Sequence, residues 1–330
     1  MSDWHTLCEL WASDLRTHIT AERWQKACQN LELFAGRLGV SVNYGVTEQG
    51  DNVTNAAFSS DVTGFLITRD SENILLTVET EALRLVLNLR RGLAVHSLAF
   101  RSHGFVPTIG TLPHGYFSTI TLGADFYTGS LIIELPQQHC RVADLERVEP
   151  EIGSVDEGLC LRVKIPTRLG VTVKTITVFS NKESISLKYD FPVWERPHGT
   201  IHAGDITLLP EAFSSPVSLT CANGGRVRES FVLDQAFDHT AAASSLVSST
   251  AGLGATDGEI VIGDKLRRLA ISWDPSQCTI MPMLIHKSTS PRPLSRLFFS
   301  MQELDDTACA GGVMGSFSMS VRAELARLLS

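Results

Sequence analysis

Residues 83–90 read Leu-Arg-Leu-Val-Leu-Asn-Leu-Arg, and this stretch decides the fold class. Leucine stands at every second position, and Arg84, Asn88 and Arg90 are among the residues that alternate with it. Successive side chains of a β-strand point to opposite faces, so this alternation predicts a strand with one buried face.

Runs of the same kind recur along the chain from about residue 62 onward, with Gly, Asn, Asp and Pro between them. The runs lie at 62–68, 73–79, 93–100, 130–135, 159–165, 171–179, 184–190, 204–209, 217–221, 226–233, 258–262, 267–273, 279–285, 295–301 and 315–323. No run is followed by a convincing helix of about 10–15 residues, which disfavours βαβ units and a parallel sheet. We therefore expect a mainly β fold, a large antiparallel β-sandwich over residues 41–330.

Residues 1–40 differ from the rest and predict a short helical hairpin. The first helix is indicated by apolar residues at helical spacing between Leu7 and Leu15, and the second by a stripe from Trp24 to Leu38. Thr20 is a suitable N-cap, and Gly39 is a natural stop. Such a stripe must be buried against the rest of the chain or against a partner, and core packing is the preferred interpretation.

Composition excludes several classes of protein. The chain has 330 residues, with 28 Lys and Arg against 36 Asp and Glu, and a formal net charge of −8 argues against nucleic acid as a partner. It shows no secretory signal and no apolar run long enough for a membrane span, so no membrane association is expected. The seven cysteines are scattered and form no Cys-x-x-Cys pair, which favours a reducing cytoplasm and no metal site. No nucleotide-binding glycine motif occurs, and we expect no cofactor.

The stretch from His103 to Tyr127 is the first candidate site, because it combines glycines and aromatic residues with titratable groups. Sites for sugars combine aromatic platforms with polar groups. The candidates for catalysis here are His103, His114 and Asp125, and the candidates for substrate binding are Tyr116 and Tyr127. The alternative is a buried loop whose histidines satisfy backbone carbonyls.

A second candidate site begins at the segment Trp194-Glu-Arg-Pro-His-Gly199. Glu195 and the nearby His202 are candidates for an acid–base pair, while Trp194 and Arg196 are candidates for substrate binding. The alternative makes Trp194 a core anchor and the neighbouring charges a solvated pair.

Two further segments carry acidic groups. In the glycine-rich segment 251–259, Asp257 and Glu259 could hydrogen-bond sugar hydroxyls, although a flexible hairpin entry is the preferred interpretation. The carboxylates at 303–306 lack the spacing of a calcium loop, so a solvated turn is expected there.

The chain resembles the C-terminal region of family 57 glycoside hydrolases, in which a helical segment precedes a galactose-mutarotase-like β-supersandwich. The likeness is carried by LWASDLRTHITAERW at 10–24, GTLPHGYFSTITLGADFY at 110–127, GDITLLPEAF at 204–213 and GLGATDGEIVIGD at 252–264. In that family the catalytic carboxylates lie in an N-terminal barrel. Only about 40 residues precede the strands of this chain, so no catalytic residue is carried over.

The resemblance implies a carbohydrate-associated domain that binds α-glucan or a related polysaccharide. A separate catalytic polypeptide would then be a partner, docked through residues 1–39. The alternative is a self-contained sugar enzyme, an epimerase, lyase or hydrolase, because mutarotases of this fold pair a glutamate base with histidine acids on the concave sheet face. A third hypothesis is an assembly protein that self-associates through the same hairpin or through its sheet edges.

Overall fold

The computed structural model describes residues 21–39, 64–113, 115–117, 125–156, 158–214, 216–223, 227–234, 252–277, 280–304 and 311–324. Helix α2 belongs to one compact unit of the chain, and all the described strands belong to another. Within the described part, no helix is both long and apolar enough to cross a bilayer.

Helix α2 (Ala21–Leu38) confirms the second helix of the predicted hairpin. It ends at Gly39, which has a left-handed φ of 68° and donates its N–H to the carbonyl of Gly36. Phe34 and Ala35 are buried, whereas Leu33 and Leu38 are 70% and 56% exposed. The first helix of the hairpin and the boundary near residue 40 lie outside the described residues.

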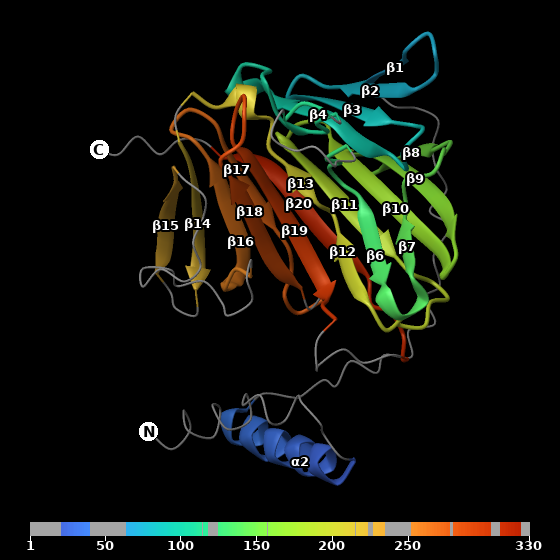
Figure 1. Ribbon diagram of the computed structural model, residues 1–330, viewed down its shortest axis with the longest axis vertical. Coiled ribbons are helices and arrows are strands. Elements are labelled where there is room, and N and C mark those ends of the chain that lie inside the picture. The colour runs from blue at the N-terminus through green and yellow to red at the C-terminus, as the bar shows by residue number, and fades with distance from the viewer. Residues whose placement is uncertain are drawn as a thin grey trace. The chain divides into compact units, whose positions relative to one another are not determined.

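The strands form three sheets, and every pairing between them is antiparallel (Figure 1). The five-stranded sheet runs β1 (Leu66–Arg69), β2 (Leu75–Glu79), β3 (Leu83–Asn88), β4 (Ala94–Phe100), β5 (Pro107–Gly110). The nine-stranded sheet runs β15 (Arg228–Leu233), β14 (Val217–Asn223), β16 (Ala255–Gly263), β17 (Arg268–Ser272), β20 (Phe317–Glu324), β11 (Ser184–Asp190), β10 (Gly170–Phe179), β9 (Gly158–Thr167), β8 (Glu151–Val155). The six-stranded sheet runs β13 (Ile206–Thr207), β19 (Leu294–Gln302), β12 (Thr200–Ala203), β6 (Leu131–Leu135), β7 (Cys140–Ala143), with β18 (Met281–Lys287) also paired to β19.

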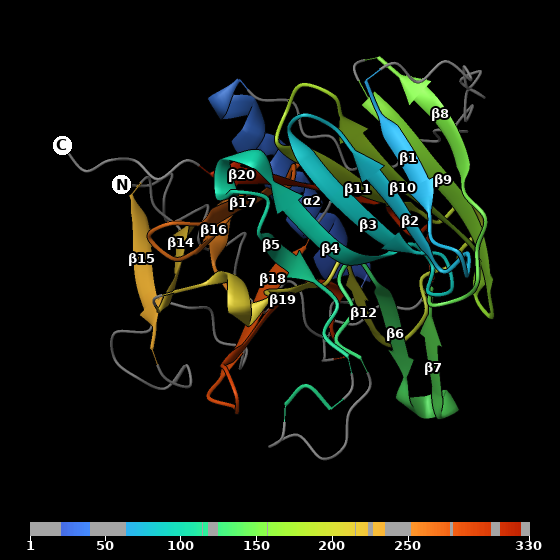
Figure 2. The same ribbon diagram turned by 90° about the horizontal axis from the view of Figure 1, so that it is seen from above.

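The six-stranded and nine-stranded sheets face each other as two layers (Figures 1 and 2). The ring of Phe299 on β19 lies 5.9 Å from that of Phe317 on β20 and 5.8 Å from that of Trp273, which follows β17. One continuous apolar core runs through all three sheets. The predicted mainly β, antiparallel sandwich is therefore confirmed.

The leucine-alternating stretch 83–90 contains strand β3. Leu83, Leu85 and Leu87 are fully buried and Arg84 is exposed, as the alternation predicts. Val86 is also buried, so part of the second face of this strand is covered too.

The predicted strands all appear, with shifted ends, but four short strands were not predicted: β5, β7, β8 and β12. Each has only four or five residues. Strand β20 continues to Glu324, and residues 325–330 lie outside the described part.

A buried polar cluster connects the nine-stranded sheet to two turns. Lys174 on β10 donates to the carbonyls of Gly92 and Gly129 and pairs with Asp144 at 3.1 Å. Tyr189 on β11 donates to Asp144 at 2.9 Å and to the carbonyl of Gly129. The side chains of Lys174 and Asp144 are fully buried, so burial lowers the pKa of Lys174 while Asp144 opposes that shift.

Candidate functional site

The candidate site lies on the face of the six-stranded sheet that points away from the core, called here the outer face. On β19, Leu297 and Phe299 are buried in the core, whereas Arg296 and Phe298, which alternate with them, remain partly accessible. Strand register places Met283 and Ile285 of β18 beside Phe298 and Arg296, and places His202 of β12 beside Ser300. The outer face therefore carries a row of apolar, aromatic and charged side chains.

His202 and Glu303 form an accessible histidine–carboxylate pair on this face. His202 Nε2 lies 2.7 Å from Glu303 Oε1, and the two side chains are 23% and 28% exposed. The strand pairing is irregular between Ile201 and His202, a bulge-type feature that re-aims side chains. Because a positioned imidazole and carboxylate can exchange protons with a ligand, the pair can serve binding or acid–base chemistry.

Arg296 is held rigidly among aromatic rings. Its guanidinium carbon lies 4.7 Å from the ring centre of Phe298 and 5.9 Å from that of Phe126. Its nitrogens donate to Tyr127 O at 2.9 Å and to Thr207 Oγ1 at 3.0 Å. A guanidinium held in this way presents a planar surface beside the two phenylalanine rings, on which a ligand can stack.

Asp205 is the charged partner of Arg296 beneath the outer face. Arg296 Nη2 lies 3.2 Å from Asp205 Oδ2, and the Asp205 side chain is fully buried. Loss of hydration raises the pKa of Asp205 to about 6, although Arg296 acts in the opposite direction. Burial in turn lowers the pKa of Arg296 from its usual value.

A hollow of about 460 Å³ adjoins these groups. Its lining combines aromatic rings with the Arg296 guanidinium, hydroxyls and an ammonium group. The lining residues are Phe126, Ile285, Lys287, Ser288, Thr289, Leu294, Arg296 and Phe298. Phe298 also contacts the His202 ring, with ring centres 5.7 Å apart, which connects the hollow to the His202–Glu303 pair.

Four residues predicted from the sequence lie at or next to this site: His202, Asp125, Tyr127 and Tyr116. His202 is on the outer face itself. Asp125 accepts a hydrogen bond from the Tyr127 hydroxyl at 2.8 Å, and Phe126 between them lines the hollow. Tyr127 is mostly buried, and burial is the main cause that raises its pKa, with Asp125 second.

Of the other candidates, His103 does not line the hollow, whereas Tyr116 packs in one apolar cluster with Phe126 and Leu294 of its lining. His103 ends the short helix η2 (Arg101–His103), is buried, and meets the Phe100 ring edge to face. Burial lowers the pKa of His103. Tyr116 donates to Glu211 and contacts the Phe117 ring. His114 lies outside the described residues.

The candidates of the segment 194–199 also lie apart from the outer face. Trp194 is 3% exposed and donates its indole N–H to Val171 O at 3.1 Å, as expected of a core anchor. Glu195 is exposed and forms an isolated bridge with Val313. Arg196 exchanges backbone hydrogen bonds with Gly311 and Gly312.

Asp257 and Glu259 belong to a charge network on the nine-stranded sheet. Arg228 lies 3.1 Å from Asp257 and 2.7 Å from Glu259, and Arg322 lies 3.0 Å from Glu259. Their oxygens are thus engaged by two arginines. Among the described residues, no group of three potential metal ligands is present.

Sequence reasoning missed Phe126, Arg296, Phe298 and Glu303 as site residues. The signal for two of them was present, because Arg296 and Phe298 alternate with apolar residues in a predicted strand and so share its non-core face. Glu303 was expected in a solvated turn; the structure pairs it with His202. That contact joins residues 101 positions apart, which no local pattern reveals.

Comparison with known proteins yields structural neighbours only. No protein family matches the sequence, and no curated protein matches it. Solved structures that resemble the chain include a TPR-domain containing protein from Parabacteroides distasonis (11% identity, TM-score 0.44, 76% of this chain and 46% of that one). A second is a 4-alpha-glucanotransferase from Thermococcus litoralis (11% identity, TM-score 0.35, 79% of this chain and 39% of that one). A third is a galactose mutarotase-like protein from Clostridium acetobutylicum (8% identity, TM-score 0.40, 79% of this chain and 97% of that one). The match thus spans less than half of the first two proteins.

Proposed function

We propose that the outer face of the six-stranded sheet binds a saccharide, and that the chain is a carbohydrate-associated domain. One observation carries this proposal: the hollow beside Phe126, Arg296 and Phe298 adjoins the accessible His202–Glu303 pair. Binding sites for small molecules combine apolar and aromatic walls with a few polar groups that fix orientation.

The chemistry of each group suits a sugar ring. The apolar C–H face of a pyranose can lie on Phe298, while ring hydroxyls can donate to Glu303 and accept from His202. Lys287 and Thr289 at the hollow can meet hydroxyls of a neighbouring sugar unit. We take α-glucan or a related polysaccharide as the ligand class.

Calorimetric titration with linear malto-oligosaccharides tests this proposal. We expect Phe298→Ala to weaken binding by about tenfold or more, because stacking and buried apolar area are both lost. Phe105→Ala is the matched control, since Phe105 is 45% exposed and does not line the hollow. Equal affinities of the wild type and Phe298→Ala, or no binding of any glucan by the wild type, would refute the assignment.

A self-contained sugar enzyme is the second candidate, favoured by the His202–Glu303 contact. The pair could move a proton at one sugar carbon, as an epimerase, lyase or hydrolase requires. Incubation with glucans and free aldoses, followed by NMR of the products, separates catalysis from binding. Turnover that is lost in His202→Asn and Glu303→Gln supports the enzyme; binding without turnover supports the carbohydrate-associated domain.

Helix α2 is proposed as a docking element, because Leu33 and Leu38 are exposed. Its partner would be a separate catalytic polypeptide or a second copy of the chain. Two measurements compare the wild type with the double variant Leu33→Lys/Leu38→Lys. Light scattering after size exclusion gives the mass in solution, and co-purification from native lysate detects a bound partner. A partner or dimer lost only in the variant supports docking; identical behaviour of the two proteins contradicts it.

A further inference from the structure

A second cavity lies on the opposite side of the β18–β19 hairpin from the outer face. Ser295 and His286 are register partners on these two strands and are nearly buried, whereas Arg296 and Ile285, the next residues, belong to the outer face. The two sites therefore use alternate residues of the same strands and do not share a surface. Strands β14 and β15 and the segment from Leu208 to Pro216 complete the walls of this cavity.

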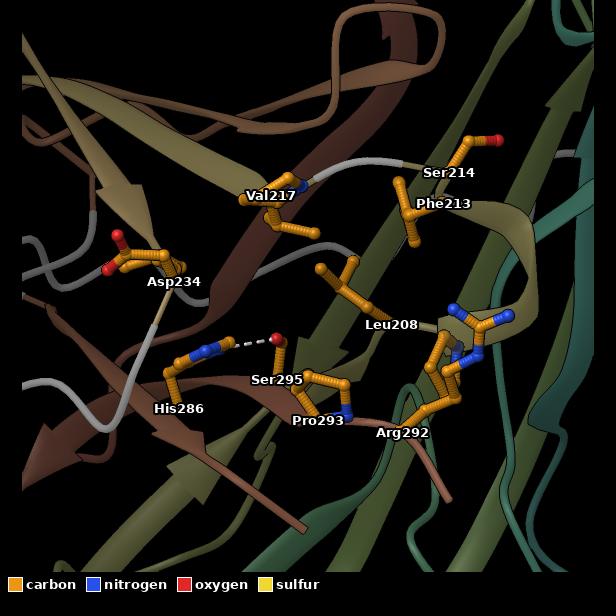
Figure 3. A pocket seen from close by; sticks show the side chains of 12 residues that line it. Leu208, Phe213, Ser214, Val217, Asp234, His286, Arg292, Pro293 and Ser295 are labelled. Carbon is orange, nitrogen blue, oxygen red and sulfur yellow. Dashed lines mark hydrogen bonds between the residues drawn. The ribbon is translucent and has the colours of Figure 1, made fainter. Parts of the chain in front are cut away.

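The walls of this cavity are mainly apolar. Leu208, Phe213, Val217, Leu233 and Pro293 line it, and it holds about 280 Å³ (Figure 3). That volume is at the small end of the range for ligand sites, so it suits a compound of about one ring.

One neutral polar pair faces this apolar space. His286 Nδ1 and Ser295 Oγ lie 2.8 Å apart, and the Ser295 hydroxyl points into the cavity (Figure 3). A hydroxyl can both donate and accept, so this group can meet an alcohol, a phenol or a carbonyl. Burial lowers the pKa of His286, which keeps the imidazole uncharged near neutral pH.

Two charged residues lie at opposite sides of the lining (Figure 3). Asp234 and Arg292 both line the cavity and carry opposite charges (Figure 3). Arg292 also lies 3.6 Å from Glu211, and both of these side chains are more than half exposed. The mainly apolar wall between these charges disfavours an ionic ligand.

We propose that this cavity binds a small uncharged ring compound that bears one hydroxyl or carbonyl oxygen, with the ring against Phe213 and Val217 and the oxygen on Ser295. The site is separate from the outer face and does not depend on saccharide binding there. It adds a second ligand class, small phenols and cyclic alcohols or ketones, to the chemistry of this chain.

Titration of the full chain with 4-methylphenol, followed by protein NMR and calorimetry, tests the proposal. We expect saturable binding by the wild type, about tenfold weaker binding by Ser295→Ala, and near wild-type binding by Ser295→Thr, which retains the hydroxyl. Toluene, which lacks the oxygen, and benzoate, which is charged, should bind more weakly than 4-methylphenol. Phe298→Ala is the control for the other site and should leave phenol binding unchanged.

Two results would overturn the proposal. One is the absence of saturable binding of 4-methylphenol and of cyclohexanone by folded wild-type protein. The other is equal affinity of wild type and Ser295→Ala for these probes, or weaker binding by Phe298→Ala alone, since the ligand would then lie elsewhere. A Val217→Phe variant that fills the cavity gives a further check, because its folded form must lose phenol binding.

Discussion

At the residue scale, the buried carboxyl of Asp205 makes the free energy of unfolding depend on pH. Its folded pKa of about 6 lies above its ordinary value of 3.8, so the folded state holds the proton more tightly than the unfolded state. The contribution of Asp205 to stability is therefore greatest near pH 4 and falls as pH rises to about 6, above which the loss is complete. The shift corresponds to about 3 kcal/mol.

The variant Asp205→Asn should lack this dependence. Urea unfolding at intervals between pH 4 and pH 7 gives the free energies of unfolding of both proteins. We expect wild-type stability, measured relative to Asp205→Asn, to fall by about 2 kcal/mol across this window. Parallel pH curves for the two proteins would show that Asp205 titrates normally.

Lys174 supplies a second prediction at this scale. Lys174→Met removes a fully buried cation and leaves Asp144 with Tyr189 as its remaining partner in the cluster, so we expect a loss of about 3–5 kcal/mol in unfolding free energy. The control is Lys188→Met, because Lys188 is 49% exposed and pairs with Asp190 at the surface, where the expected loss is below about 1 kcal/mol. Similar losses in the two variants, measured by urea unfolding, would contradict the structural role of the buried cluster.

At the element scale, the turn between β3 and β4 requires glycine. Gly92 has a φ of 57°, and a Cβ added there would lie 1.8 Å from the carbonyl oxygen of Asp144. Gly104 has a similar φ of 68° but open space around it. We expect Gly104→Ala to cost about 1–2 kcal/mol for the left-handed backbone alone, and Gly92→Ala to cost clearly more. Thermal unfolding gives the melting temperatures of both variants. Equal melting temperatures would argue against a close contact between residue 92 and the carbonyl of Asp144.

Strands differ in how far the sequence predicts them. β3 is evident because four leucines alternate over seven residues, and β10 and β19 because they are long. β12 has four residues, Thr-Ile-His-Ala, between a proline-bounded loop and Gly204, so no local pattern marks it. His202 was therefore named as a candidate from its chemistry, while its place beside Phe298 and Glu303 depends on sheet order, which only tertiary packing determines.

At the scale of the whole strand unit, packing of the six-stranded sheet on the nine-stranded sheet decides which residues are free to bind. Phe299 and Leu297 pack in the core, so Phe298 and Arg296 must face outward. Composition and alternation predicted the mainly β sandwich. They could not predict which candidates meet. Trp194 is buried in the core, Glu195 is exposed in the segment before β12, and Asp257 and Glu259 lie on β16 of the nine-stranded sheet, and only tertiary packing decides these positions.

The most direct test of saccharide binding is methyl NMR of the full chain during titration with malto-oligosaccharide. Ile132, Met283 and Ile285 have methyl groups on strands of the six-stranded sheet, at register positions of the outer face. We expect their signals, together with that of the His202 ring, to shift in a saturable manner, while Val227 and Val193, exposed elsewhere, stay unchanged. Saturable shifts confined to other surfaces, or none at millimolar saccharide, would contradict the assignment of the outer face as a carbohydrate site.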